Sequence, residues 1–384
     1  MDLIFNAVPL LGRQTGVGHY ARQIAQGLAA RPDMFSTTYY YGYYSRKLIG
    51  DDENGSAASL IGRIKSLIAR RPLARRVCRK GLAVAGAAWH ALRGVRHDCY
   101  FEPNFVLMPG IRARHAVLTA HDFSCFLYPQ WHPAERVCFM EKHFRAGLER
   151  ADAVITVSEA IRKEALELFS LAPDRVHAIP NGVDLRRFHP GTEDSRRAAR
   201  RRLNLPEHFI LHVGTLEPRK NLSGLLDAHA ALPEALQRRF PLLLAGAPGW
   251  NNADILAKIE KRSAYVQLRG YVADADLPDL YRAADVVAYP SWYEGFGLPA
   301  LEALACGCPT LISTDAALRE VCGDAALCAP PGDTDAMSAR LKELLENETL
   351  HSDLRRRGPE QAARFRWETS VQRHLELFVK LCAR

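Results

Sequence analysis

Residues 285–303 read DVVAYPSWYEGFGLPALEA, and this stretch decides the fold. The apolar, β-branched run at 285–289 predicts a buried strand, and the run from Leu298 predicts a helix with Pro299 in its first turn, where proline is favoured. A buried strand that leads through a glycine loop into a helix is the repeating unit of a parallel α/β sheet. Ligands of open parallel sheets bind outside the carboxyl ends of the strands, so we expect this loop to face a ligand.

The same alternation of short apolar runs and helical patterns continues in both directions. Strands are expected at 2–8, 35–41, 98–102, 116–120, 153–157 and 175–179 in a first set, and at 208–213, 241–245, 265–269, 285–289 and 309–313 in a second. Helices are expected at 17–30, 134–150, 159–169, 222–232, 276–283, 298–306, 334–346 and 350–364. This order predicts two doubly wound, Rossmann-like domains that face each other across a crevice.

The length of 384 residues also favours two domains, because one hydrophobic core rarely fills a chain of this size. We expect a first domain at 1–188, a polar linker at 189–206 and a second domain at 207–366. Residues 367–384 carry apolar side chains at helical spacing and follow the last strand, so we expect a helix that crosses back to the first domain.

The net charge of +8 is concentrated in one segment. Ten of the 51 basic residues lie between Asn54 and His97 without any acidic residue, and the rest of the chain has 41 basic against 43 acidic residues. Residues 61–80 place apolar side chains near one helical face and Arg and Lys on the other, which is typical of a helix on an anionic membrane surface. A solvated helix packed on its own domain is the alternative. We expect no nucleic-acid partner, because the segment lacks the aromatic platform of such sites.

Three further features bear on the compartment. No run of 18 apolar residues predicts a membrane span, and residues 1–8 resemble a first strand rather than a signal peptide. The nine cysteines form no paired Cys-x-x-Cys units, so we expect a reduced, cytoplasmic chain without a zinc site.

Glu294 and Glu302 lie eight positions apart on either side of the glycine loop. The unpaired amides and the dipole at the start of the following helix suit a pyrophosphate, and Gly295 and Gly297 allow close approach of the backbone. Glu294 is placed to accept hydrogen bonds from sugar hydroxyls, and Glu302 to bind a ribose diol. The loop residues expected to touch such a ligand are Gly295, Phe296, Gly297 and Leu298.

A basic pair ends the first strand of the second set, in the sequence HVGTLEPRKNL at 212–222. Arg219 and Lys220 would project into the crevice and neutralise a diphosphate. A leaving group that gains negative charge is stabilised by such preorganised cations, typically by about 3 kcal/mol each. A solvated basic pair is the alternative, and it carries more weight for Arg219 than for Lys220.

In the first domain, Gly16 and Gly18 open the first helix. The string GVGHYA fits the dinucleotide fingerprint G-x-G-x-x-A, which leaves an NAD-dependent oxidoreductase as a rival interpretation. The long gap after the strand and the missing carboxylate on the second strand argue against it. We interpret the glycines as a loop that lies beneath the phosphates of a bound donor substrate and beside the acceptor substrate.

His121 and Asp122 end another strand and point toward the crevice. His121 is expected to bind a sugar hydroxyl or to line the reaction centre with Lys220 and Glu294, the alternative being a structural histidine that caps the strand. Asp122 is expected to orient its loop. The Asp-x-Asp pairs at 274–276 and 333–335 precede helices, so we interpret them as helix caps and expect no catalytic metal.

Together these motifs resemble the retaining family 4 of glycosyltransferases, which has the GT-B fold. The matches run from the glycine loop at 16–18 through His121 and GTLEPRKN at 214–221 to the E-x7-E pair. The resemblance implies that Glu294 contacts the donor sugar, Glu302 the nucleotide ribose, and Lys220 with Arg219 the diphosphate. Many members have Arg where Thr215 stands, which is a departure in the phosphate-binding region.

The stretch HDFSCFLYPQWHPAER at 121–136 resembles the bacterial branch that builds O-antigen and related surface polysaccharides. That resemblance implies transfer of mannose or a related hexose from a GDP-sugar co-substrate to a glycan or lipid-linked glycan, without a further cofactor. It also implies retention of configuration, with the departing phosphate oxygen taking the acceptor proton. The alternatives are a nucleotide-sugar epimerase or hydrolase on the same fold, and a non-catalytic binding subunit.

Overall fold

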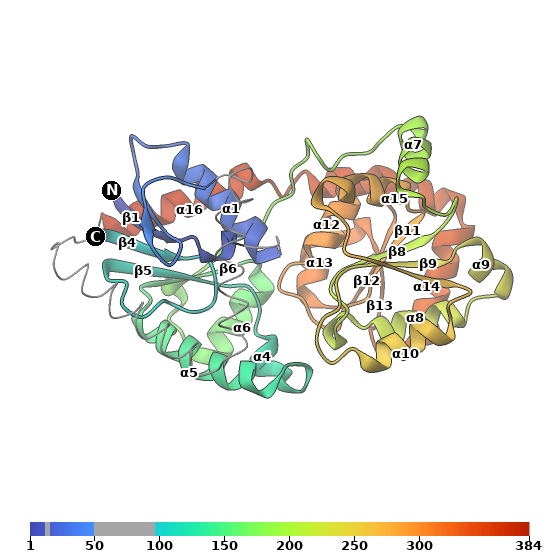
Figure 1. The fold of residues 1–384 in the computed structure, drawn as a ribbon, viewed down its shortest axis with the longest axis horizontal. Helices are drawn as coiled ribbons and strands as arrows, with labels where there is room; N and C mark the ends of the chain where they lie inside the picture. The colour runs from blue at the N-terminus through green and yellow to red at the C-terminus, as the bar shows by residue number, and fades with distance from the viewer. Residues whose placement is uncertain (12–15, 50–96, 384) are drawn as a thin grey trace.

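The computed structural model describes residues 1–11, 16–49 and 97–383, and their strands form two sheets (Figure 1). The seven-stranded sheet has the order β3-β2-β1-β4-β5-β6-β7, in which only the β2–β3 pairing is antiparallel. The six-stranded sheet has the order β10-β9-β8-β11-β12-β13 and is wholly parallel. We call the parts built on these sheets the first and the second lobe.

The bounds of the elements are as follows. The first sheet contains β1 (Asp2–Asn6), β2 (Ser36–Tyr40), β3 (Tyr44–Ser45), β4 (His97–Glu102), β5 (Ala113–Ala120), β6 (Ala153–Thr156) and β7 (Val176–Ala178). Its described helices are α1 (Gly16–Ala29), α4 (Ser124–Leu127), α5 (Ala134–Arg150) and α6 (Glu159–Phe169), with short 3-10 turns η1 (Val8–Leu10), η3 (Pro129–Trp131) and η4 (Pro173–Arg175). The second sheet contains β8 (Ile210–Val213), β9 (Leu242–Ala245), β10 (Val266–Gly270), β11 (Val286–Tyr289), β12 (Thr310–Ser313) and β13 (Leu327–Ala329). Its helices are α7 (Glu193–Leu203), α8 (Leu222–Ala230), α9 (Glu234–Arg239), α10 (Ala253–Lys261), α11 (Leu277–Ala283), α12 (Leu298–Ala305), α13 (Ala316–Cys322), α14 (Thr334–Glu346) and α15 (Glu348–Ala362), with turns η5 (Pro218–Lys220), η6 (Asp274–Asp276) and η7 (Gly323–Ala325).

Helices cover both faces of each sheet, and alternate residues of a strand therefore enter different cores. Ile210 on β8 packs with residues of α8 and α14, whereas its neighbour Leu211 packs with residues of α11 and α12. In the first lobe, Ile4 faces the α5 side and Phe5 faces α1. This two-sided burial explains why the strands are continuously apolar rather than alternating.

The C-terminal helix, α16 (Trp367–Cys382), lies on the first lobe, although it follows the second lobe in the sequence (Figure 1). Its buried side chains join the core that contains α1 and β1. An added Cβ at Gly27 would overlap the side chain of Val371, so this glycine lets α1 and α16 pack closely. Among the described helices, none has the length and apolar character needed to cross a membrane.

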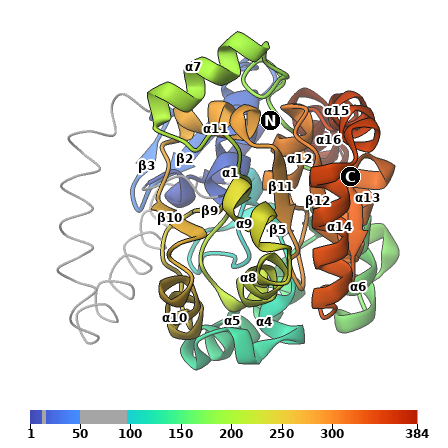
Figure 2. The same ribbon diagram turned by 90° about the vertical axis from the view of Figure 1, so that its right-hand side faces the viewer.

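The segment expected to be a linker, 189–206, contains the helix α7. Thr192 caps its first turn by accepting a hydrogen bond from the Ser195 amide, and Arg200 donates to the carbonyl oxygen of Ala283 in α11. Figure 2, which looks onto the second lobe, shows α7 lying over α11. The basic residues 61–80, for which we expected a membrane-surface helix, lie outside the described residues.

Candidate active site

Lys220 and Glu294 form a buried ion pair. Lys220 ends η5, directly after β8, and its Nζ donates to Glu294 Oε1 at 2.6 Å and to the Tyr289 hydroxyl at 2.6 Å. The two charged residues are 8% and 6% exposed. Burial alone raises the pKa of Glu294, but the charges of Arg219 and Lys220 outweigh it and lower that pKa to about 2. Glu294 is therefore a carboxylate at any physiological pH.

Arg219 donates hydrogen bonds to this carboxylate and to groups beside it. Its Nη1 donates to Glu294 Oε2 and to the carbonyl oxygen of Tyr293, both at 2.9 Å. Its Nη2 donates to Glu217 at 2.9 Å, and Glu217 is only 2% exposed. In the structure the donors of Arg219 hold Glu294 in place, and diphosphate binding by Arg219 stays a prediction.

The glycine loop brings the second lobe against the first. An added Cβ at Gly295 would overlap the carbonyl oxygen of His121, and the Ser158 hydroxyl donates to the carbonyl oxygen of Gly295 at 2.7 Å. Gly297 has a φ of 93° and precedes α12, whose start has no side-chain cap. Leu298, the first residue of α12, packs against cores of both lobes. Phe296 is buried and its ring lies against Phe365.

Asp315 supports the same loop and was not predicted from the sequence. Its carboxylate accepts hydrogen bonds from the amides of Glu294, at 3.3 Å, and Leu318, at 3.0 Å. Burial raises the pKa of Asp315 to about 6. It thus links the start of α13 to the glutamate loop.

On the first lobe, His121 and Asp122 lie at the end of β5. The His121 Nε2 is 2.8 Å from the carbonyl oxygen of Pro103, which can only accept, so Nε2 carries the proton and Nδ1 is an acceptor. Burial lowers the pKa of His121, which keeps the imidazole neutral at pH 7. Asp122 accepts hydrogen bonds from the amide and hydroxyl of Ser124, so its carboxylate orders the loop.

The first-lobe glycines lie beside the same helix opening. α1 begins at Gly16, and an added Cβ there would lie 3.6 Å from Leu298 Cδ1 in α12. Gly18, two residues further along α1, is buried. The structure therefore brings Gly16, His121, Gly295 and Lys220, which are spread over 280 residues of sequence, to one place between the lobes.

Glu302, the second glutamate, has different surroundings. The Tyr281 hydroxyl donates to Glu302 Oε2 at 2.9 Å, and burial raises the pKa of Glu302 to about 7. His19 on α1 reaches across from the first lobe, with its Nε2 3.3 Å from Asp274 Oδ1. Arg187 donates to the same aspartate at 2.8 Å. A polar cluster drawn from both lobes thus adjoins Glu302.

The cap interpretation of the Asp-x-Asp pairs is right for one pair and wrong for the other. Asp333 accepts a hydrogen bond from the Ala336 amide and caps α14. Asp274 and Asp276 cap no helix: Asp274 pairs with His19 and Arg187, and Asp276 accepts from Arg202 at 2.6 Å. These basic partners come from distant parts of the chain, which a local sequence pattern does not reveal.

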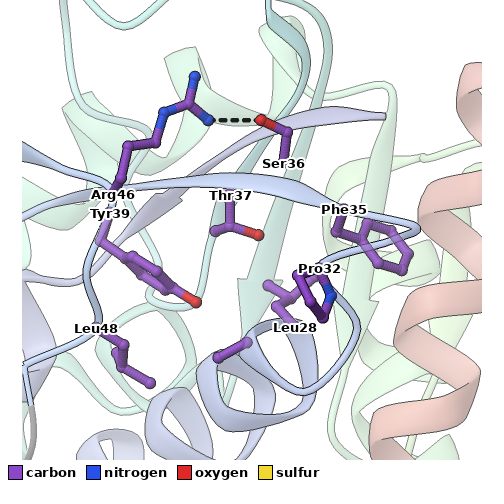
Figure 3. A pocket seen from close by; sticks show the side chains of 9 residues that line it. Leu28, Pro32, Phe35, Ser36, Thr37, Tyr39, Arg46 and Leu48 are labelled. Carbon is purple, nitrogen blue, oxygen red and sulfur yellow. Dashed lines mark hydrogen bonds between the residues drawn. The ribbon is translucent and has the colours of Figure 1, made fainter.

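A cavity of about 330 Å³ lies elsewhere, between the end of α1 and the strands β2 and β3 (Figure 3). Arg46 and Ser36, which are hydrogen bonded at 2.7 Å, stand at one side, and Leu28, Pro32, Phe35 and Leu48 line the rest. None of the residues predicted for the site lines this cavity.

Comparison with known proteins matches both lobes. The family model described as Glycosyltransferase Family 4 matches residues 14–187, and the one described as Glycosyl transferases group 1 matches residues 195–361. The chain is 35% identical over 382 residues to O-antigen chain mannosyltransferase B of Escherichia coli, covering 98% of this chain and 99% of that protein.

Solved structures share the fold. Sucrose-phosphate synthase from Thermosynechococcus elongatus has a TM-score of 0.74 at 22% identity, covering 100% of this chain and 99% of that one. HepE from Anabaena, solved in complex with UDP-glucose, has a TM-score of 0.71 at 18% identity, covering 99% and 100%. At these identities the likeness establishes the two-lobed α/β architecture.

Proposed function

The chain belongs to family 4 of the glycosyltransferases, and from this premise we propose that it transfers mannose, with retention of configuration, from a GDP donor to a glycan or lipid-linked glycan acceptor of a surface polysaccharide. The name of the Escherichia coli relative, which aligns over nearly the whole of both chains, supports mannose as the sugar and O-antigen as the product class. The observation that carries the proposal is the buried Lys220–Glu294 pair at the glycine loop, against the backbone of His121 in the other lobe.

The ammonium group of Lys220 is suited to a diphosphate. Two of its three N–H donors are used by Glu294 and Tyr289, which leaves one for a phosphate oxygen. The open start of α12 adds amide donors and a favourable dipole. Because these charges are fixed before the reaction, they stabilise the departing nucleotide as it gains negative charge.

The carboxylates and His121 are assigned to the sugar and the ribose. Both oxygens of Glu294 keep lone pairs beyond those used by Arg219 and Lys220, and these accept sugar hydroxyls. His121 Nδ1 accepts a further sugar hydroxyl. Glu302 binds the ribose diol. No protein base is assigned, since the departing phosphate oxygen takes the proton of the acceptor.

The donor is tested by a panel of GDP-mannose, UDP-glucose and ADP-glucose, each with and without a mannan oligosaccharide primer. We expect transfer only with GDP-mannose and primer, and an α-linked product by NMR. Turnover that does not need the primer would instead support an epimerase or hydrolase. Lys220→Ala should lower kcat by about 100-fold or more, whereas Lys258→Ala, which removes an exposed ion pair with Asp227, should leave it unchanged.

We also infer contact with an anionic membrane through residues 61–80. The support is the amphipathic, basic sequence alone, since the segment lies outside the described residues. Flotation with vesicles that contain anionic lipid, at modest salt, should carry the chain upward; a chain that stays at the bottom would refute this contact.

A further inference from the structure

We infer that two buried tyrosines position the two glutamates and divide their work: Tyr289 holds Lys220, and through it Glu294, for the chemical step, and Tyr281 holds Glu302 for nucleotide binding. The inference rests on the proposed function and assigns its site two further positioning residues. Tyr289 is 1% exposed on β11 and Tyr281 is fully buried on α11. A buried tyrosine hydroxyl needs a polar partner: the Tyr281 hydroxyl meets Glu302, and the Tyr289 hydroxyl meets Lys220, the partner of Glu294.

The Tyr289 hydroxyl is one of two acceptors of the Lys220 ammonium group. It accepts the hydrogen bond from Lys220 Nζ at 2.6 Å, and the same Nζ donates to Glu294 Oε1 at 2.6 Å, so Lys220 joins the hydroxyl to the carboxylate. Lys220 Nζ is 5.0 Å from the centre of the Tyr289 ring, which adds a cation–π attraction. The ammonium group is therefore fixed by two acceptors, and its remaining donor has a defined direction.

His212 on β8 fixes the tyrosine ring. The two rings are stacked, with centroids 5.7 Å apart and planes 13° apart. The carbonyl oxygen of Ala288 accepts from His212 Nδ1 at 2.9 Å, which sets the orientation of the imidazole. Burial lowers the pKa of His212 to about 4, so the stacked imidazole adds no positive charge beside Lys220. Residues on the neighbouring strands β8 and β11 thus fix the position of the Lys220 ammonium group.

Tyr281 has the corresponding role at the other glutamate, but without a cation in the network. Its hydroxyl donates to Glu302 Oε2 at 2.9 Å. The Tyr281 ring lies 6.1 Å from Phe188, within the core of the second lobe. Removal of this hydroxyl would free the carboxylate that receives the ribose, and it would leave Lys220 and Glu294 untouched.

The test is a matched pair, Tyr289→Phe and Tyr281→Phe, in the full chain, with donor varied at saturating primer. Tyr289→Phe should lower kcat by about 10-fold or more with the donor KM within about threefold. Tyr281→Phe should raise the donor KM by about 10-fold with kcat within about threefold. If both variants changed kcat and the donor KM to the same extent, the proposed division of roles between Tyr289 and Tyr281 would be refuted.

Two further readouts separate positioning from loss of structure. In Tyr289→Phe the ammonium group loses an acceptor, so the decline of kcat at high pH should begin about one pH unit lower. The double variant Lys220→Ala/Tyr289→Phe should be no slower than Lys220→Ala, because Tyr289 acts through Lys220. Additive losses, or a pH profile like that of the wild type, would refute the inference. A wild-type chain inactive with every sugar nucleotide would refute the proposed function instead.

Discussion

Glu294 and Glu302 belong to the same sequence motif, but their pKa values are shifted in opposite directions. Two cations at hydrogen-bond distance lower the pKa of Glu294 to about 2, although burial opposes them. Glu302 is also removed from water, but its hydrogen-bond partner is the neutral hydroxyl of Tyr281, so burial dominates and raises its pKa to about 7. One carboxylate is thus permanently charged, and the other titrates in the physiological range.

This difference predicts how donor binding depends on pH. Only the ionised form of Glu302 accepts both hydroxyls of a ribose, so affinity is full well above pH 7, is halved near the pKa of about 7 and falls further below it. The donor KM should rise about tenfold per pH unit between pH 6.5 and 5. Steady-state kinetics across this range measures the effect.

The control for this prediction is Glu302→Gln, which has no titrating group. Its donor KM should be high and flat over the same range. A wild-type KM that is constant from pH 8 to 5, or a Glu302→Gln profile that still bends near pH 7, would assign the titration to another group. His19, Asp274 and Arg187 face Glu302, and among these His19→Gln is the next variant to measure.

At the level of single residues, the sequence predicted the motif residues that the structure brings together better than it predicted the residues that support them. Lys220 and Glu294 follow strands in recognisable motifs, and the structure brings them together. Tyr289 and Asp315 were not predicted, because their roles depend on contacts between segments far apart in the chain. A buried tyrosine at the end of a strand is only a core residue until its partner is known.

Among the elements, the loop before α12 closely approaches the first lobe. The backbone of His121 occupies the space where a side chain at Gly295 would lie, and a backbone oxygen cannot swing away. Gly295→Ala should therefore hold the lobes apart and lower kcat/KM by about 100-fold, the effect of a misplacement of about 1 Å at a reacting centre. Kinetics and small-angle scattering of the same sample measure both parts.

The control is Gly147→Ala on α5. An added Cβ there would make an ordinary contact at 3.6 Å from Leu118, so activity should stay within about twofold. If Gly295→Ala had wild-type kcat/KM, the close approach of Gly295 to His121 could not be needed in the active state.

Most strands and helices could be predicted, and two of the exceptions, α7 and β13, have clear physical causes. The expected helices 134–150, 159–169 and 334–346 agree with α5, α6 and α14, because each has a long, periodic apolar face. α7 was missed because Ala199 is its only buried residue; the helix depends on its cap and on packing with α11 rather than on an apolar stripe. The strand β13 is only three residues long, which is too short for a clear period.

In the whole molecule, the predicted GT-B architecture and family are confirmed, and the contacts between the lobes are what the sequence could not supply. The Tyr293 hydroxyl accepts from the Phe123 amide at 2.9 Å and donates to Glu164 at 2.6 Å. On another side, Trp250 donates to the carbonyl oxygen of Trp131 at 2.7 Å. Such contacts join residues more than 100 positions apart, and polar groups of one lobe satisfy polar groups of the other.

One contact of this kind joins the two lobes through a single charged side chain, that of Glu320. Glu320 on α13 accepts hydrogen bonds from the amides of Glu159 and Ala160, both at 2.9 Å, so a carboxylate of the second lobe caps α6 of the first. A negative charge at a helix start is favourable, by up to about 2 kcal/mol where it is partly buried. Glu320→Gln removes the charge and turns an amide NH₂ toward one of the two N–H donors, so the closed arrangement should become less populated.

We therefore expect Glu320→Gln to have a larger radius of gyration by small-angle scattering without donor and a donor KM raised by about three- to tenfold. Saturating donor should restore the compact dimensions, because the donor bridges both lobes in the proposed function. Glu343→Gln, which removes an exposed carboxylate paired with Arg340 within α14, is the matched control and should change neither quantity. Added salt should move the wild type toward Glu320→Gln, since a partly exposed charge is screened. Scattering curves that coincide for both variants and the wild type would show that another contact sets the distance between the lobes.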